Sequence, residues 1–146
     1  MKHLKLLPLV IGMLMTTGEV KAQAAGEEPG KNVVVDGLAY TLDKTAKTAA
    51  VIPNSYYDDN KEEHLLCAPY VGDIAVPETI TVEGVDYTVT ELSEKAFDEA
   101  DITSLALPSS IKKLGYWSIS FCTELKKVNV PASVEEIAEG TFRFCT

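Results

Sequence analysis

The chain has 146 residues, of which 22 are acidic and 13 are basic, so its formal net charge is −9 at pH 7. A protein surface with this excess of acidic residues repels nucleic acid and anionic lipid, because phosphate binding requires clustered lysine and arginine. The length is typical of one domain, and 46% hydrophobic residues are enough for a single continuous core.

Residues 1–24 have the form of a secretory signal peptide. A basic start (residues 2–5) precedes an apolar run of ten residues (6–15), and Ala22-Gln23-Ala24 supplies a small-x-small cleavage site. A membrane span needs about 20 apolar residues, so this run is too short to be one. We expect export, with the mature protein secreted, at the cell surface or in the periplasm, and no membrane span. The alternative interpretation of the run is a buried core helix.

A polar linker at residues 25–31 leads into a region rich in strand patterns. Two short strand patterns flank Asp36-Gly37, a pair typical of hairpin turns, and residues 48–52 have the composition to pair with them. Residues 55–63 are predicted to form a charged, turn-rich loop. We interpret residues 32–73 as a small N-terminal β cap that covers the open end of the repeats described next.

One pattern occurs twice in residues 102–145. Residues 102–114 have the sequence ITSLALPSSIKKL, and residues 125–137, which lie 23 positions later, have the sequence LKKVNVPASVEEI. The two segments match at their leading apolar residue and at their proline. Ile119-x-x-Cys122 recurs at the same interval as Phe142-x-x-Cys145. A fixed period of this size, led by L-x-x-L-x-L, predicts a leucine-rich-repeat solenoid.

The apolar residues of each unit indicate how its coil closes. Leu105 and Leu107 alternate with small or polar residues, which is typical of a short strand with one buried face, and Pro108 ends the strand because it has no N–H to donate. The apolar residues that follow are expected to turn inward again through short helical turns. One coil cannot bury its own apolar side, so neighbouring coils must stack on it.

An altered unit precedes these two. Its second half, from Val89 to Ala100, aligns with the next unit at a spacing of 22, but Pro77 lies 31 residues before Pro108. The surplus residues around Gly84 predict a hairpin grafted into the first coil. The fold class is therefore mainly β with short helical turns. We expect a short solenoid of period 23 with an N-terminal β cap, in which residues 74–146 hold about two and a half to three units.

The repeat resembles that of a known family. Pro131-Ala-Ser-Val134-x-x-Ile137-x-x-x-Thr-Phe142-x-x-Cys145 is similar to the repeat of the BspA-like leucine-rich-repeat proteins, and 72–77 and 35–40 resemble the segments that precede such arrays. The resemblance implies exported or surface-exposed bacterial proteins, some of which bind host or neighbouring-cell proteins as adhesins. It implies no shared catalytic residues. We therefore expect a non-enzymatic module that binds a host, neighbouring-cell or matrix protein. The alternative is a structural module that assembles with copies of itself, or a fragment of a longer surface array.

Catalytic and metal-binding patterns are weak. Outside residues 1–24 the chain has one histidine, His64, with no partner motif, and its three cysteines lack companions at zinc-ligand spacing. The acidic residues of 58–63 offer carboxylates to calcium, but the D-x-D-x-D-G spacing is absent. We predict no cofactor and no catalytic residue.

The cysteines are expected to be free thiols. Cys122 and Cys145 occupy equivalent positions on coils that stack about 4.8 Å apart, and parallel side chains keep their Cβ atoms near the same distance. A disulfide prefers a Cβ separation of about 3.5 to 4.5 Å. We predict that both act as small buried apolar residues and that Cys67 is unpaired.

Four residues are candidates for protein contacts. Tyr116 and Trp117 fall at a repeat position that reads Glu94-Lys95 one unit earlier and Glu139-Gly140 one unit later, so at least one ring is expected to be exposed. Exposed aromatic residues are favoured anchors in interfaces. Lys127 and Asn129 join them because they alternate with the apolar residues of their strand. The alternative is that one aromatic ring fills a gap on the convex side.

The last coil is expected to present an apolar end. Val134, Ile137, Phe142 and Phe144 belong to a coil with no capping segment after it. Solenoids need a polar cap for solubility, and an exposed strand edge is a template for pairing. Self-association through this end is therefore a further prediction.

Overall fold

The computed structural model describes residues 23–24, 32–57 and 59–145. The predicted signal peptide, apart from Gln23 and Ala24, and the predicted linker at 25–31 lie outside the described residues. Within the described part of the chain, no helix has the length and apolar character needed to cross a membrane.

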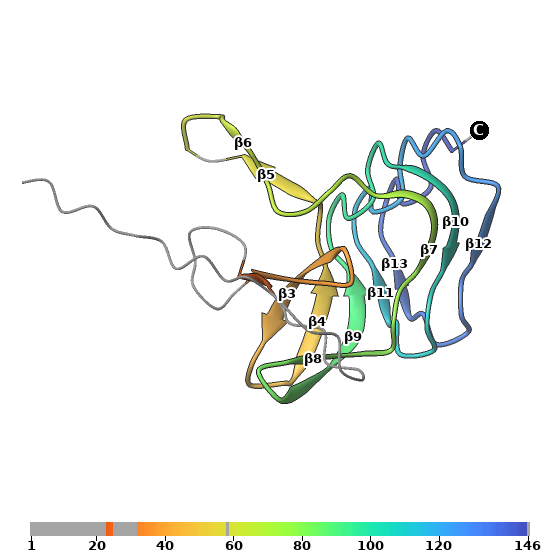
Figure 1. Cartoon of the computed structure of the whole chain (residues 1–146). Helices are drawn as coiled ribbons and strands as arrows, with labels where there is room; N and C mark the ends of the chain where they lie inside the picture. The colour runs from red at the N-terminus through yellow and green to blue at the C-terminus, as the bar shows by residue number, and fades with distance from the viewer. Residues whose placement is uncertain (1–22, 25–31, 58, 146) are drawn as a thin grey trace, which may run out of the picture.

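The region predicted to be a β cap begins with an antiparallel meander (Figure 1). Its strands are β2 (Asn32–Val35), β3 (Leu38–Asp43) and β4 (Thr48–Val51). β1 (Gln23–Ala24), which belongs to the predicted signal peptide and not to the predicted cap, pairs with β2. Asp36 and Gly37 both have positive φ, 49° and 81°, as the favoured two-residue hairpin turn requires. The predicted hairpin and the pairing of residues 48–51 with it are therefore confirmed.

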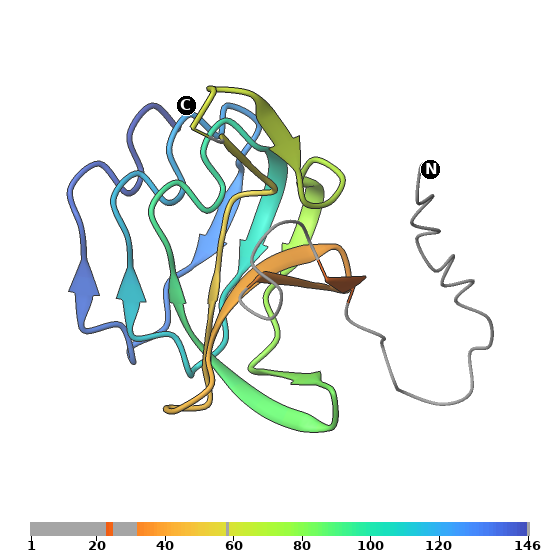
Figure 2. The ribbon, with the colours of Figure 1, turned by 90° about the vertical axis from the view of Figure 1, so that its left-hand side faces the viewer.

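The repeats form coils with a parallel sheet on each of two sides. One sheet contains β7 (Val71–Ala75), β10 (Asp101–Ala106) and β12 (Lys127–Asn129), and Leu105 lies opposite Ile74 and Val128. The other contains β9 (Val85–Leu92), β11 (Lys113–Leu114) and β13 (Glu136–Ile137). The register between Leu105 and Val128 equals the repeat period of 23. Figure 2 shows the coils stacked side by side.

The two regions share one sheet and one core. β4 pairs in parallel with β9, so the meander extends the sheet of the coils. The apolar repeat positions face inward, and those of the middle coil, among them Leu105, Leu107, Ile111, Leu114 and Ile119, are at most 5% exposed. Tyr70 connects the predicted cap to the coils inside the core, because its buried ring packs on Phe97 of the first coil with centroids 5.1 Å apart.

Two hairpins extend from this body. β8 (Thr79–Val82) pairs antiparallel with β9 around Glu83-Gly84, which confirms the predicted hairpin in the first coil. The segment predicted as a loop at 55–63 contains more order than expected. It begins with β5 (Ser55–Tyr57), and its last residue starts β6 (Glu63–Leu65), which pairs antiparallel with β5. This hairpin projects from the body (Figure 1).

The prediction of short helical turns is wrong, because the described residues contain no helix. Each coil instead closes through successive tight turns at 93–100, 115–122 and 138–145, which we call the turn edge. In the first coil Lys95 and Glu99 have left-handed backbones, which a helix does not tolerate. Their amides donate to the carbonyls of Tyr116 and Ser120 on the next coil. The turns are thus joined from coil to coil by hydrogen bonds that a helix would have kept within itself.

Candidate protein-binding surface

The turn edge repeats one backbone conformation in every coil. Lys95, Trp117 and Gly140 occupy equivalent positions with φ of 57°, 52° and 71°. A second row contains Glu99, Phe121 and Phe144, with φ of 58°, 52° and 56°. The coil therefore imposes the left-handed conformation, but it accepts charged, aromatic or glycine residues there.

Four aromatic rings are exposed at the outward repeat positions of this edge. Tyr116, Trp117, Phe121 and Phe144 are 58%, 40%, 45% and 50% exposed, and we call them the aromatic edge. Both rings singled out from the sequence are thus exposed, which confirms the expectation that at least one would be. A bulky residue in the left-handed region is uncommon, and such strain is concentrated at functional sites. Grouped exposed apolar side chains mark interaction surfaces.

Three rings of the aromatic edge, those of Trp117, Phe121 and Phe144, are held by neighbouring side chains. The Lys95 ammonium lies 5.3 Å from the centre of the Trp117 ring, and the Arg143 guanidinium lies 4.7 Å from that of Phe144. Phe121 and Phe144 pack together with centroids 4.7 Å apart. These contacts hold the rings in place before a partner arrives, which reduces the entropy lost on binding.

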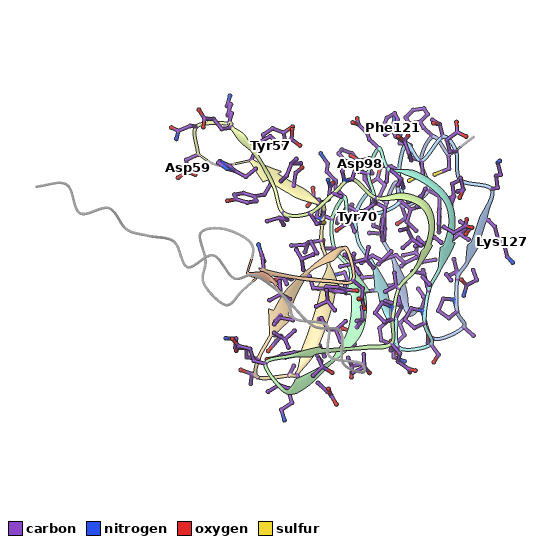
Figure 3. The ribbon with its side chains drawn as sticks, in the orientation of Figure 1. Tyr57, Asp59, Tyr70, Asp98, Phe121 and Lys127 are labelled. Atoms are coloured by element: carbon purple, nitrogen blue, oxygen red, sulfur yellow. The ribbon has the colours of Figure 1, made fainter. Side chains whose placement is uncertain are left out.

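A small cavity adjoins the first coil of the turn edge. It has a volume of about 90 Å³, and its walls include Tyr70, Lys95, Asp98, Glu99 and Asp101. Figure 3 labels two of these wall residues, Tyr70 and Asp98. The Ser120 hydroxyl donates a hydrogen bond to Asp98, so this carboxylate is positioned by the neighbouring coil. The cavity thus combines an aromatic wall with several carboxylates.

Lys127 and Asn129 lie on a different surface, the outward side of the β7–β10–β12 sheet. Figure 3 places Lys127 on the side of the molecule and Phe121 at the turn edge. Lys127 is exposed and lies opposite Ser104. The hydroxyls of Ser104 and Thr103 each donate to Asp73 at 2.7 Å, and these bonds lower the pKa of Asp73. The structure therefore keeps the two predicted pairs of contact residues on separate surfaces.

Asn129 has a role within the coil. Its carboxamide oxygen accepts a hydrogen bond from the Leu107 amide at 2.9 Å, and its amide donates to the Leu107 carbonyl at 3.0 Å. The side chain thereby continues the hydrogen bonding between the two coils beyond the end of β10. Its part in binding a partner stays a prediction.

Phe121 and Phe144 complete the aromatic edge, and Arg143 lies over the Phe144 ring. The sequence did not single out Phe121 or Arg143, and it grouped Phe144 with the apolar end. The signal was present in the chain, because Phe121 stands where Glu99 stands one coil earlier. A polar counterpart in a neighbouring repeat therefore identifies an outward position.

Features considered for chemistry have structural partners. His64 stacks on Tyr56 with ring centroids 5.1 Å apart. Across the described residues no group of three or more metal-ligating side chains is suited to hold an ion; Asp58, part of the calcium candidate, lies outside them. The three cysteines are free thiols in the structure. Cys122 and Cys145 donate to the carbonyls of Phe97 and Ile119 on the preceding coils.

The stacked coils, their two parallel sheets and the period of 23 define a leucine-rich-repeat solenoid. Residues 78–146 match the family described as BspA type leucine rich repeat region (6 copies). The repeat part of the chain therefore belongs to the BspA-type leucine-rich repeats. No curated protein matches the chain.

Solved structures share this fold. A leucine rich repeat protein of T. pallidum is 22% identical with a TM-score of 0.57, over 75% of this chain and 44% of that protein. One from Bacteroides capillosus is 23% identical with a TM-score of 0.56, over 75% of this chain and 88% of that protein. A leucine rich cell surface protein of Faecalibacterium prausnitzii is 20% identical with a TM-score of 0.61, over 78% of this chain and 28% of that protein. The chain thus spans less than half the length of the first and third of these proteins.

Proposed function

We propose that this chain is an exported, non-enzymatic bacterial protein that binds a protein ligand at the cell surface or after secretion. The BspA-type repeats and the solved cell surface protein with the same fold support this proposal. The ligand class is a surface or matrix protein of a host or a neighbouring cell.

The aromatic edge carries the proposal. The coil does not require aromatic residues there, since Lys95 and Glu99 occupy the same backbone positions one coil earlier. Tryptophan and tyrosine dominate the energetic centres of protein interfaces. Rings fixed on a ladder of hydrogen-bonded turns provide such a centre with little loss of flexibility on binding.

A binding assay tests this function. The chain from Ala25 to Thr146 is immobilised and exposed to purified matrix and surface proteins, and binding is measured by interferometry. Replacing Trp117 and Phe121 by asparagine should weaken binding at least about tenfold, as expected for interface hot spots. Asparagine tolerates the left-handed backbone, so the variant keeps its fold. Tyr57→Ala, which removes an exposed ring from the β5–β6 hairpin, is the control and should bind normally. Retention of binding by the double variant would contradict the proposed surface.

Export is tested separately. N-terminal sequencing of protein released by the producing cell should begin at Ala25. Recovery of the chain with Met1 intact would exclude cleavage after Ala24.

Lys127 and Asn129 are proposed as a second contact area. Lys127→Glu reverses one exposed charge on the sheet, and reduced binding without a change in the unfolding midpoint would support this area. Unchanged binding would restrict the surface to the turn edge.

Self-association through the last coil is the second candidate function. Ile137 is 54% and Phe142 37% exposed, whereas Leu114 and Ile119, their equivalents one coil earlier, are fully buried. Phe144 is exposed for another reason, because its equivalent Phe121 is exposed as well. A second copy stacked on this coil would cover Ile137 and Phe142. Appending a polar repeat after Thr146 should then convert a dimer to a monomer in sedimentation velocity, and a monomer without the added repeat would exclude this candidate.

A further inference from the structure

The surroundings of the aromatic edge are acidic. The turn edge and the residues just after its turns carry carboxylates at Glu94, Asp98, Glu99, Asp101, Glu124 and Glu139. The side-chain ion pairs found among the described residues lie elsewhere, on the β9–β11–β13 side. They join Lys113 to Glu91 and Glu136, and Lys112 to Glu135, at 3.4 to 4.0 Å. Among the described residues, the carboxylates of the turn edge therefore form no ion pair with a lysine or arginine of this chain, although Asp98 accepts a hydrogen bond from Ser120.

Two rings of the aromatic edge, those of Trp117 and Phe144, already bind cations of this chain. Lys95 over Trp117 and Arg143 over Phe144 lie within the distance of about 6 Å at which a cation is attracted to a ring face. The geometry thus demonstrates the kind of contact that an incoming arginine or lysine would make. Phe121, between them in the sequence and 45% exposed, offers a further ring.

The cavity beside the first coil suits the same side chains. Tyr70, Pro53 and Pro69 provide apolar walls. Asp98, Glu99 and Asp101 provide three negative charges against the single positive charge of Lys95, whose ammonium lies over the Trp117 ring. Arginine and lysine have apolar stems and charged heads, so both parts find a matching surface in this cavity. Its volume of about 90 Å³ limits the occupant to a single side chain or part of one.

We propose that the aromatic edge, together with the adjoining acidic cavity, binds a basic segment of the partner protein, in which arginine or lysine residues alternate with apolar ones. This inference rests on the proposed protein-binding function and specifies the partner's charge. The apolar side chains of the segment cover Phe121 and Trp117, and its cations face Glu99 and Asp101. Charge complementarity makes this association fast and dependent on salt.

The single tryptophan of the chain provides a direct signal of binding, because Trp117 lies within the proposed surface. Three synthetic peptides of equal length carry the same leucine and phenylalanine residues, interspersed with arginine, glutamine or glutamate. Each is titrated into the chain 25–146 while Trp117 emission is recorded. The arginine peptide should shift the emission and bind at least about tenfold more tightly than the glutamine peptide, and the glutamate peptide should bind more weakly still. Raising the salt concentration from about 50 to about 500 mM should reduce this preference, because added ions screen charges on a protein surface.

Matched variants separate the two parts of the surface. Phe121→Asn with Phe144→Asn retains the Trp117 reporter and should weaken all peptides about tenfold. Glu99→Gln with Asp101→Asn keeps the side-chain volumes and should lower the arginine-over-glutamine preference at least threefold. Tyr57→Ala should change neither value.

Several results would overturn the inference. Equal affinity for the arginine and glutamine peptides would show that charge does not select the partner. Binding without any change in Trp117 emission, or binding unaffected by both double variants, would place the site elsewhere. A Trp117 emission that changes with protein concentration in the absence of peptide would show that the aromatic edge binds a second copy of the chain. A matrix protein whose binding requires Trp117, together with failure of all basic peptides, would leave the proposed function standing and remove this inference.

Discussion

Gly140 lies directly against the indole of Trp117 on the neighbouring coil. A Cβ added to Gly140 would overlap Trp117 Cδ1 and Nε1, so only glycine leaves room for the ring in this position. Gly140 also has a φ of 71°, in the region that favours glycine. The last described coil therefore supports one ring of the aromatic edge by lacking a side chain.

Gly140→Ala should destabilise the protein by more than the backbone strain alone, which is about 1–2 kcal/mol for a left-handed residue. The same change in a Trp117→Lys background should cost only that strain, because the ring is gone and lysine is tolerated at the equivalent position, Lys95. Chemical denaturation of the four proteins gives the coupling between the two positions. Additive effects would show that the indole moves away from Gly140 freely.

Asn129→Ala should lower the free energy of unfolding by about 1–3 kcal/mol, the cost of leaving buried polar groups without partners. Leu107 is 5% exposed, and the variant removes the side chain that satisfies both its N–H and its C=O. Lys127→Ala, on the same strand but pointing to solvent, is the control and should change stability by less than about 0.5 kcal/mol. Equal, small effects would mean that water replaces the carboxamide.

Tyr70→Phe should destabilise the contact between the meander and the coils by about 1–3 kcal/mol. The Tyr70 hydroxyl donates to the Ile52 carbonyl and accepts from the Ala39 amide, both at 2.9 Å, while the ring is buried. Hydrogen exchange should therefore quicken first at Ala39. Tyr57→Phe, which alters an exposed hydroxyl, should leave exchange unchanged; protection at Ala39 equal to that of the parent would contradict this role.

The buried Cys122 thiol should lower the free energy of unfolding at alkaline pH. Burial raises the pKa of its thiol to about 12, whereas an unfolded thiol titrates near pH ~8.5. Above about pH 8.5 the unfolded state loses a proton that the folded state keeps, so the stabilisation present below that pH is lost progressively up to about pH 12. Cys122→Ala, which copies Ala100 of the preceding coil, should flatten this decline by up to about 1.4 kcal/mol per pH unit. Unfolding titrations between about pH 8 and pH 11 measure the difference, and identical slopes would show that the thiol does not govern it.

The thiols themselves should be unbridged. Alkylation of the unfolded chain without reductant should modify Cys67, Cys122 and Cys145, as measured by mass spectrometry. Two or fewer modified cysteines would reveal a disulfide that the structure lacks.

The sequence by itself determined the repeat and its register. Because a strand buries every second residue and coils stack in parallel, a spacing of 23 is sufficient to place Leu105 beside Val128. The Asp36-Gly37 turn and the hairpin at Gly84 were equally local, since each depends on residues adjacent in the chain. Polar counterparts in neighbouring repeats also identified Tyr116 and Trp117 as outward positions.

Only the tertiary structure decided how the turns close and how the meander meets the coils. The spacing of the apolar residues was compatible with helical turns, but left-handed residues and the hydrogen bonds from Lys95 and Glu99 to the next coil replaced them. The pairing of β4 with β9 and the contact of Tyr70 with Phe97 join residues 27 or more positions apart that do not share a repeat position. Lys127 and Asn129 were separated from Trp117 for the same reason, because a coil turns its strand and its turn edge toward different sides. Distances of this kind follow from the path of the coil in space, which no local pattern of residues encodes.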